Sequence, residues 1–223
     1  MKRIITIIFA VFIATTAFAQ ENKYTIGLVG FGYSPNYTIL RGNEMVEKNL
    51  FPDKGFTHGI SFKYNLKKSL SLQTELLYES KAVKVHKRGA PTYPDMGSFG
   101  KHFDYITIPF LFQLSFGKKI VFFSNTGIFM SYLIKETDWY YSGYSGEIQS
   151  TNNTKSYKRI DAGITTGLGI AVPIKKRLVI SLELRNNLGL FDVNEIKYLS
   201  SDMTTKTNST NLLIGLAYKF GKK

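Results

Sequence analysis

Histidine is the first residue type to examine for chemistry, because the charge of its side chain changes near neutral pH. The sequence has three histidines, His58, His86 and His102. His86 and His102 flank one polar segment, where a lipid-processing enzyme could use them together with Asp104 or a nearby serine. Their spacing fits no catalytic triad, and no residue is placed to orient a base. We therefore predict a non-enzymatic protein and keep a rim site at His86 and His102 as the alternative.

The content of cysteine and histidine also bears on metal and redox chemistry. The chain has no cysteine, so it has neither disulfides nor thiolate metal sites. The histidines never fall at the helical spacing of zinc ligands. We expect no metal and no cofactor.

Two further groups of residues could bind a partner. The densest aromatic cluster, which includes the only tryptophan, could anchor a protein or a glycan, or it could continue a membrane-interface girdle. Its members are Trp139, Tyr140, Tyr141 and Tyr144. A basic group could pair with phosphates of lipopolysaccharide, or it could be an ordinary solvated loop. Its members are Lys84, Lys87, Arg88 and Lys101.

Residues 1–19 have the composition of a secretory signal peptide. Two basic residues precede an apolar run from Ile4 to Ala14, and Ala17-Phe18-Ala19 has the form of a cleavage site. The apolar run is too short for a stable membrane-spanning helix, and an uncleaved anchor is the alternative. We expect a single mature domain over residues 20–223.

The net charge of +13 suggests a polyanionic neighbour. For an exported chain, a surface of lipid phosphates fits this charge better than nucleic acid does. No basic stretch is interleaved with the aromatic side chains that a single-stranded nucleic acid site needs for stacking.

Beyond the signal segment, no run of 18 apolar residues occurs, which argues against a spanning helix there. Apolar and polar residues alternate instead with the period of two of a β-strand. In residues 59–66, for example, Ile60 and Phe62 share one face, and Ser61 and Lys63 share the other. This alternation predicts eight strands, at 24–35, 59–66, 70–78, 103–116, 120–135, 159–172, 176–187 and 211–220.

Short and long connections between these strands alternate along the chain. Tight turns are expected at 67–69, 117–119 and 175–176, and long polar loops at 36–55, 84–102, 136–157 and 189–207. All the long loops would then lie at one end of the molecule, as in outer-membrane barrels. The predicted fold is all-β, an eight-stranded antiparallel up-and-down transmembrane β-barrel with both termini at the turn end. A soluble lipocalin-like barrel is the alternative.

A barrel in lipid turns its aliphatic residues outward, and polar side chains fill its narrow interior. The signal peptide, the bulk of the apolar faces and the glycines on the polar face of residues 159–172 favour this orientation. Charged residues that point inward must then pair, because an isolated buried charge costs several kcal/mol. We expect a plug made of a polar network, with an ion or proton path as the alternative. Its members are Lys63, Glu75, Glu79, Gln113, Asp161, Glu183 and Arg185.

Aromatic residues near the strand ends predict a girdle at each lipid boundary, where a ring can lie among headgroups. The turn-end set is Tyr24, Tyr64, Phe116, Tyr218 and Phe220. The loop-end set is Tyr33, Tyr78, Phe103 and Tyr132.

Several segments together resemble the PorT-like outer-membrane β-barrel family of Bacteroidota. They are LSLQTELLYESKAVKV, FDYITIPFLFQLSF, NTGIFMSYLI, RIDAGITTGLGIAV, LVISLELRNNLGLFDV and LIGLAYKF. The resemblance implies an outer-membrane barrel that the barrel-assembly machinery folds, and some relatives are linked to secretion and gliding. The family's last strand usually ends on an aromatic residue, whereas here Phe220 is followed by Gly221-Lys222-Lys223.

The expected role is that of a structural, adhesive or accessory component of the cell envelope that acts through its four long loops. The expected partners are outer-membrane lipids and lipopolysaccharide, the assembly machinery, and a secretion or envelope complex. A soluble carrier of small molecules is a third reading.

Overall fold

The computed structural model describes residues 23–30, 35–42, 51–53, 55–88, 95–141, 147–175, 177–195 and 205–221. The signal segment predicted at 1–19 lies outside these ranges. The strands are β1 (Tyr24–Val29), β2 (Pro35–Gly42), β3 (Phe51–Pro52), β4 (Gly55–Asn65), β5 (Leu70–Arg88), β6 (Asp95–Gly117), β7 (Val121–Tyr141), β8 (Ile148–Asn152), β9 (Ile160–Pro173), β10 (Leu178–Gly189) and β11 (Thr205–Phe220). A 3-10 helix, η2, covers Thr154–Ser156. In the part of the chain that the structure describes, no helix is long and apolar enough to cross a membrane.

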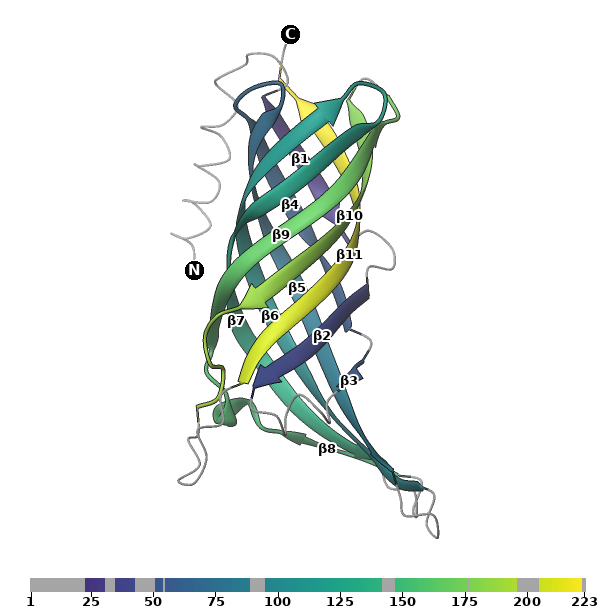
Figure 1. Ribbon diagram of the computed structural model, residues 1–223, viewed down its shortest axis with the longest axis vertical. Helices are drawn as coiled ribbons and strands as arrows, with labels where there is room; N and C mark the ends of the chain where they lie inside the picture. The colour runs from purple at the N-terminus through teal and green to yellow at the C-terminus, as the bar shows by residue number, and fades with distance from the viewer. Residues whose placement is uncertain are drawn as a thin grey trace, which may run out of the picture.

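The strands form one antiparallel sheet that closes on itself as a barrel (Figure 1). The wall runs from β4 through β5, β6, β7, β9 and β10 to β11. The ring closes because β1 pairs with β11 on one side and with β4 on the other. β2 pairs with β11 farther along the same edge as β1, so β1 and β2 together fill one strand position. The ring therefore has eight strand positions. The predicted eight-stranded antiparallel barrel is confirmed.

The first wall strand is divided at Gly30, which the sequence pattern does not reveal. Gly30 has a φ of 74°, and a side chain there would overlap the carbonyl oxygen of Thr57. Glycine alone adopts this conformation without strain and allows so close a backbone approach. The predicted strand 24–35 is therefore β1 up to Val29 and resumes as β2 at Pro35.

The tight turns gather at one end, here called the turn end (top of Figure 1). Leu66–Ser69 joins β4 to β5, and Gly117 begins the turn between β6 and β7 with a φ of 112°. Tyr24 and Phe220 face each other at this end, so the described chain begins and ends there.

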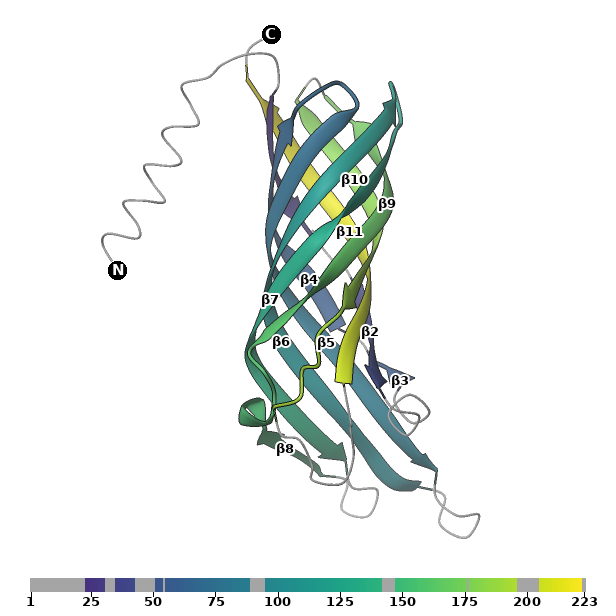
Figure 2. The ribbon, with the colours of Figure 1, turned by 60° about the vertical axis from the view of Figure 1, so that its left-hand side comes forward.

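The prediction of four long loops is wrong over much of its length. β5 continues to Arg88, β6 begins at Asp95, and β7 continues to Tyr141, where β8 pairs with it. These residues form a sheet that projects obliquely beyond the barrel, as Figure 2 shows. We call it the sheet extension and define it as residues 83–88, 95–103 and 135–141 with β8. The strands continue after the outward apolar row ends, because an antiparallel ladder needs an apolar face on one side only, and Val83 and Phe103 are buried on the inner side.

The barrel has an apolar exterior and a polar interior. Phe116 and Leu168 on the outside are each 68% exposed, and most wall strands carry a similar row of exposed aliphatic or aromatic side chains. Among the described residues, buried polar and charged side chains outnumber buried apolar ones. This is the reverse of a water-soluble barrel, and it is the orientation that the signal segment, the bulk of the apolar faces and the glycines of residues 159–172 favour.

Aromatic rings gather at the turn end of the outer wall. The ring centroid of Tyr24 lies 5.4 Å from that of Tyr64 and 5.6 Å from that of Phe220. The girdle prediction is wrong for Phe103, which is buried and stacks on Tyr105 with ring centroids 6.4 Å apart. Phe103 shares the inward face of Tyr105, two residues along the same strand. Tyr33 lies outside the described residues.

Candidate functional site

Arg185 occupies the middle of the barrel with a carboxylate on each of two sides. Its Nη1 and Nη2 donate hydrogen bonds of 2.5 and 3.0 Å to Glu75 on β5, and its Nε and Nη2 each donate one of 2.8 Å to Glu183 on β10. Arg185 is 1% exposed, and both glutamates are buried. We call these three residues the Arg185 cluster. Such double bidentate pairing offsets much of the cost of burying the charges.

Amide side chains extend the Arg185 cluster across the barrel. Gln73 donates to Glu75 over 2.5 Å, and Asn125 on β7 donates to Glu183 over 2.9 Å. Gln113 on β6 donates in turn to Asn125 over 3.0 Å. Four wall strands, β5, β6, β7 and β10, therefore meet in one hydrogen-bonded layer that occupies the lumen.

A second buried cluster lies between this layer and the sheet extension. The Nζ of Lys81 lies 3.8 Å from a carboxylate oxygen of Glu79 and 3.8 Å from one of Asp161. It also lies 4.7 Å from the ring centroid of Tyr105, within the range of a cation–π contact. All three charged side chains are fully buried. We call them the Lys81 cluster.

Hydroxyl and amide groups donate hydrogen bonds to three of the four carboxylate oxygens of the Lys81 cluster, and Oδ1 of Asp161 is buried without a hydrogen-bond partner. Thr107 donates to Glu79 over 2.6 Å, and Asn187 donates to the same carboxylate over 3.0 Å. Thr207 donates to Asp161 over 2.6 Å.

Two glycines of β9, Gly167 and Gly169, make room for large inward side chains. A methyl group at Gly167 would overlap a carboxylate oxygen of Glu183, and one at Gly169 would overlap the ring of Phe123. Each glycine thus lies against a large inward side chain of a neighbouring strand. The predicted role of these glycines as space for larger neighbours is confirmed.

Six of the seven predicted lumen residues lie in these two layers. Lys63 is the exception: its Nζ lies 6.0 Å from the ring centroid of Phe123, and within the described residues no carboxylate lies within 4.0 Å of it. Sequence reasoning missed Lys81, because the predicted strand stops at Tyr78. It also passed over Gln73 and Asn125, whose amides look unremarkable until the carboxylates beside them are known.

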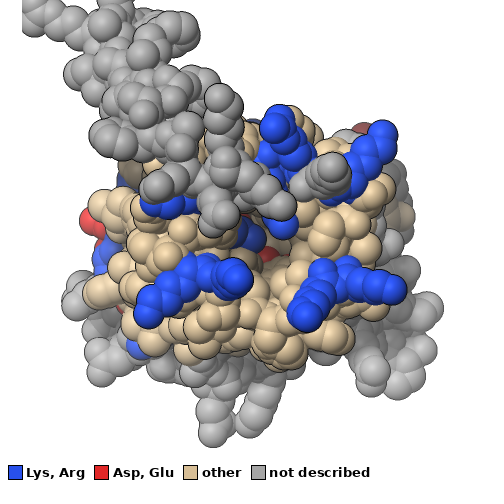
Figure 3. Space-filling view, turned by 90° about the horizontal axis from the view of Figure 1, so that it is seen from above, with Lys and Arg blue, Asp and Glu red and all other residues tan. Residues whose placement is uncertain are grey.

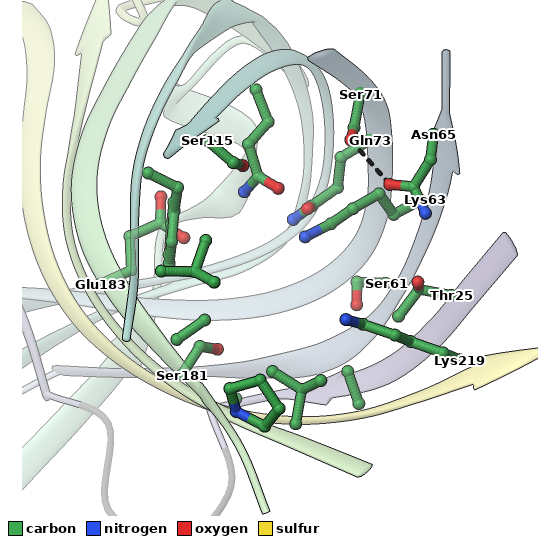
Figure 4. A pocket seen from close by; sticks show the side chains of 18 of the residues that line it. Thr25, Ser61, Lys63, Asn65, Ser71, Gln73, Ser115, Ser181, Glu183 and Lys219 are labelled. Atoms are coloured by element: carbon green, nitrogen blue, oxygen red, sulfur yellow. Dashed lines mark hydrogen bonds between the residues drawn. The ribbon is translucent and has the colours of Figure 1, made fainter. Parts of the chain in front are cut away.

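A cavity of about 680 Å³ opens at the turn end and reaches down to the Arg185 cluster (Figure 4). Glu75, Glu183 and Gln113 form its floor. Lysines surround its mouth, and we call the cavity the basic vestibule. The lining lysines are Lys23, Lys63, Lys67, Lys68 and Lys219.

The sheet extension holds its own charged group on the face that continues the barrel interior. Lys101 lies 2.5 Å from Asp138 and 3.6 Å from Glu136. Burial, together with the neighbouring Asp138, raises the pKa of Glu136 to about 8. Burial opposes the charged form of Lys101, but Tyr157 and Asp138 outweigh it and raise the pKa of Lys101. The outward apolar row of β7 ends at Ile134, so this group lies beyond the apolar wall.

The basic residues expected to form a loop lie on strands instead. Lys101 points inward on β6 and is engaged by two carboxylates, so it is not available to an external phosphate. Lys84 on β5 lies 3.7 Å from Asp53. Lys87 and Arg88 form the end of β5, where the structure describes the backbone and not their side chains.

The aromatic residues expected in the third loop also belong to a strand. Trp139, Tyr140 and Tyr141 end β7. Trp139 lies against Gly100 of β6, where any side chain would overlap the indole. Because successive residues of a strand point to opposite faces, Tyr140 is separated from the other two. Tyr144 lies outside the described residues.

The structure does not bring His86 and His102 together. His86 pairs with Ser98, whereas His102 pairs with Ala82. The two positions are four residue pairs apart along the β5–β6 ladder, roughly 13 Å at 3.3 Å per residue. Among the described residues, no group of three histidine, aspartate or glutamate side chains could hold a metal ion.

Comparison with known proteins gives one family and several similar folds. The profile of the family described as "Outer membrane protein beta-barrel domain" matches residues 18–195. Neisserial surface protein A is 14% identical, with 89% of this chain and 97% of that chain covered and a TM-score of 0.47. Ail, the attachment invasion locus protein of Yersinia pestis, is 9% identical, with coverages of 89% and 99% and a TM-score of 0.44. No curated protein has a significantly similar sequence.

Proposed function

Because this chain belongs to the outer membrane protein beta-barrel domain family, we propose that it is a non-enzymatic accessory component of the bacterial outer membrane. In this proposal the barrel is an anchor closed to solutes, and the sheet extension is a docking surface outside the cell. The observation that carries the proposal is the Arg185 cluster, which joins β5 and β10 across the lumen with fully used charges.

The finer assignment rests on the sequence. The segments quoted above support a PorT-like relationship within Bacteroidota, and with it export through the signal peptide at 1–19 and release of a domain over 20–223. The barrel-assembly machinery would fold this domain, and lipopolysaccharide would surround its outer half. A secretion or envelope complex is the partner class that such a relationship favours.

Electrical recording tests whether the barrel is closed. Wild-type protein in a planar bilayer should give no steady conductance, because six buried polar side chains fill one layer of the lumen. The triple variant Glu75→Ala, Glu183→Ala and Arg185→Ala should conduct. Discrete channel openings by the wild type would contradict the anchor role.

The absence of cysteine allows a direct test of orientation. Ile148→Cys on the exposed strand β8 should react in intact cells with a maleimide that cannot cross membranes. Lys118→Cys, in the turn between β6 and β7, should react only after the outer membrane is opened. The reverse pattern would place the sheet extension inside the cell and remove the docking surface.

The enzymatic alternative has a simple test. His86→Ala and His102→Ala, alone and together, should leave the lipid A profile unchanged. A changed profile in either variant would favour the rim enzyme, although the β5–β6 register separates the two residues.

A further inference from the structure

The anchor role leaves the basic vestibule unused. Its lining carries five lysines, and Figure 4 shows Lys63 and Lys219 directed into it from β4 and β11. Both lysines are half-buried. Within the described residues, none of the five has a carboxylate within 4.0 Å. Unpaired cations in a hollow repel one another, and an anion bound there would relieve this repulsion.

The carboxylates of the floor attract Lys63 but offset only part of the charge of these lysines. Glu75 and Glu183 are both engaged by the guanidinium of Arg185. With Arg185, which lies behind the floor, the positive charges number six, five lysines and one arginine. The negative charges number two, Glu75 and Glu183. The vestibule therefore keeps a strong positive potential that low-dielectric walls concentrate.

The surrounding turns increase the same imbalance. Figure 3 shows basic side chains, in blue, grouped around the opening at this end. Lys118, Lys119, Lys175 and Arg177 are exposed on the turns themselves. No described acidic residue lies on these turns, so an anion that approaches this end meets a field of one sign.

We propose that the basic vestibule binds a phosphate-bearing anion. Its ligating groups would be the ammonium groups of Lys63 and Lys219, with hydroxyls such as those of Thr25 and Ser181 nearby. Lysine binds phosphate as a point charge, and the guanidinium of Arg185 behind the floor is already engaged by Glu75 and Glu183. The volume of about 680 Å³ lies in the usual range for small-molecule sites. The phosphate could belong to a free solute or to a lipid headgroup at the mouth.

Calorimetry with inorganic tripolyphosphate tests the proposal in full-length mature protein held in a maltoside detergent, which contains no phosphate. The double variant Lys63→Met and Lys219→Met should weaken binding about tenfold or more, because each ammonium makes a charge-assisted contact. The matched control is Lys118→Met and Lys119→Met, which removes the same charge at the same end but outside the lining. Its affinity should stay within about threefold of the wild type. No binding by the wild type, or equal weakening in both variants, would overturn the proposal.

A second measurement does not depend on the variants folding. In wild-type protein, saturating tripolyphosphate should protect Lys63 and Lys219 from acetylation, read by mass spectrometry, more strongly than it protects Lys118. Equal protection at all three positions would also refute the site.

Nanodiscs separate the two sources of phosphate. If a lipid headgroup is the natural occupant, phosphatidylglycerol discs should weaken tripolyphosphate binding by competition relative to maltoside micelles, which contain no phosphate. Equal affinity in discs and micelles assigns the site to a free solute. These outcomes do not involve conductance or the sheet extension, so they are independent of the proposed anchor role.

Discussion

Arg185 and its two glutamates show how a charged residue can be stable in the middle of a barrel. The guanidinium donates to both carboxylates, and amides from β5 and β7 complete the bonding. Removal of the arginine alone would leave two carboxylates buried and unpaired. The free energy lost when only the arginine is removed greatly exceeds the net free energy that the intact cluster contributes to stability.

We therefore predict that Arg185→Met lowers the free energy of unfolding by about 3–5 kcal/mol. Equilibrium unfolding in urea, followed through the fluorescence of Trp139, measures this loss. The triple variant Glu75→Gln, Glu183→Gln and Arg185→Met should recover most of it, because no net charge then remains buried. Arg177→Met on an exposed turn is the control and should be neutral. If Arg185→Met is as stable as the wild type, the charges of the Arg185 cluster are not buried and mutually paired.

Gly167 permits a second prediction at the scale of one residue. A methyl group there would overlap Glu183, so Gly167→Ala should cost about 1–3 kcal/mol as overpacking. Thr166→Ala, on the outer face of the same strand, should cost much less. If both changes have the same effect in urea unfolding, the glycine serves strand conformation and not interior space.

At the scale of the elements, the sequence predicts each strand well where lipid and lumen differ and poorly elsewhere. Residues 103–116 alternate cleanly because Phe110 faces outward and Leu111 faces inward. The same strand begins eight residues earlier, at Asp95, where no apolar row distinguishes the two faces. The pairing inside the lumen is equally hidden, since Glu75 and Arg185 are 110 residues apart. Alternation places both residues on the inner face but contains no information about which inner residues meet.

The sheet extension should respond to pH through Glu136. The pKa of this carboxyl is about 8 in the folded protein and near 4.5 when exposed. Between these values the folded form holds a proton that the unfolded form has lost, so the stability that Glu136 contributes is fully present below pH 4.5 and is lost as the pH rises toward 8. Glu136→Gln should remove this dependence, whereas Glu147→Gln, an exposed residue, should keep it. Hydrogen exchange of the β7 and β8 amides at pH 5.5 and 8.5, corrected for intrinsic rates, gives the measurement. An unchanged pH dependence in Glu136→Gln would refute this assignment.

At the scale of the whole molecule, the barrel wall and the sheet extension contact different media. Leu168 lies in the middle of the outward row of β9 and is 68% exposed, and Ile148 on β8 is 71% exposed. In water the two positions would be equivalent. In a bilayer only Leu168 contacts hydrocarbon, because β8 lies beyond the apolar wall.

Leu168→Arg should therefore cost about 2–4 kcal/mol in unfolding from lipid vesicles, the usual penalty for a cation near the bilayer centre. Ile148→Arg should change the same measurement by less than about 0.5 kcal/mol. Equal costs at the two positions would mean that lipid does not cover the wall where the apolar band indicates.

The closure of the ring through β1 has a kinetic consequence. Thr38 of β2, which continues the position of β1, is bonded to Ser209 of β11 across this seam, and the two residues are 171 positions apart. Contacts of such large sequence separation form slowly, since the loop entropy is lost before they stabilise anything. Until that moment β1 and β11 each have an unsatisfied edge that could template aggregation. We expect the pairing across this seam to be the last step of folding. A delay at this step would prolong the exposure of the unpaired edges.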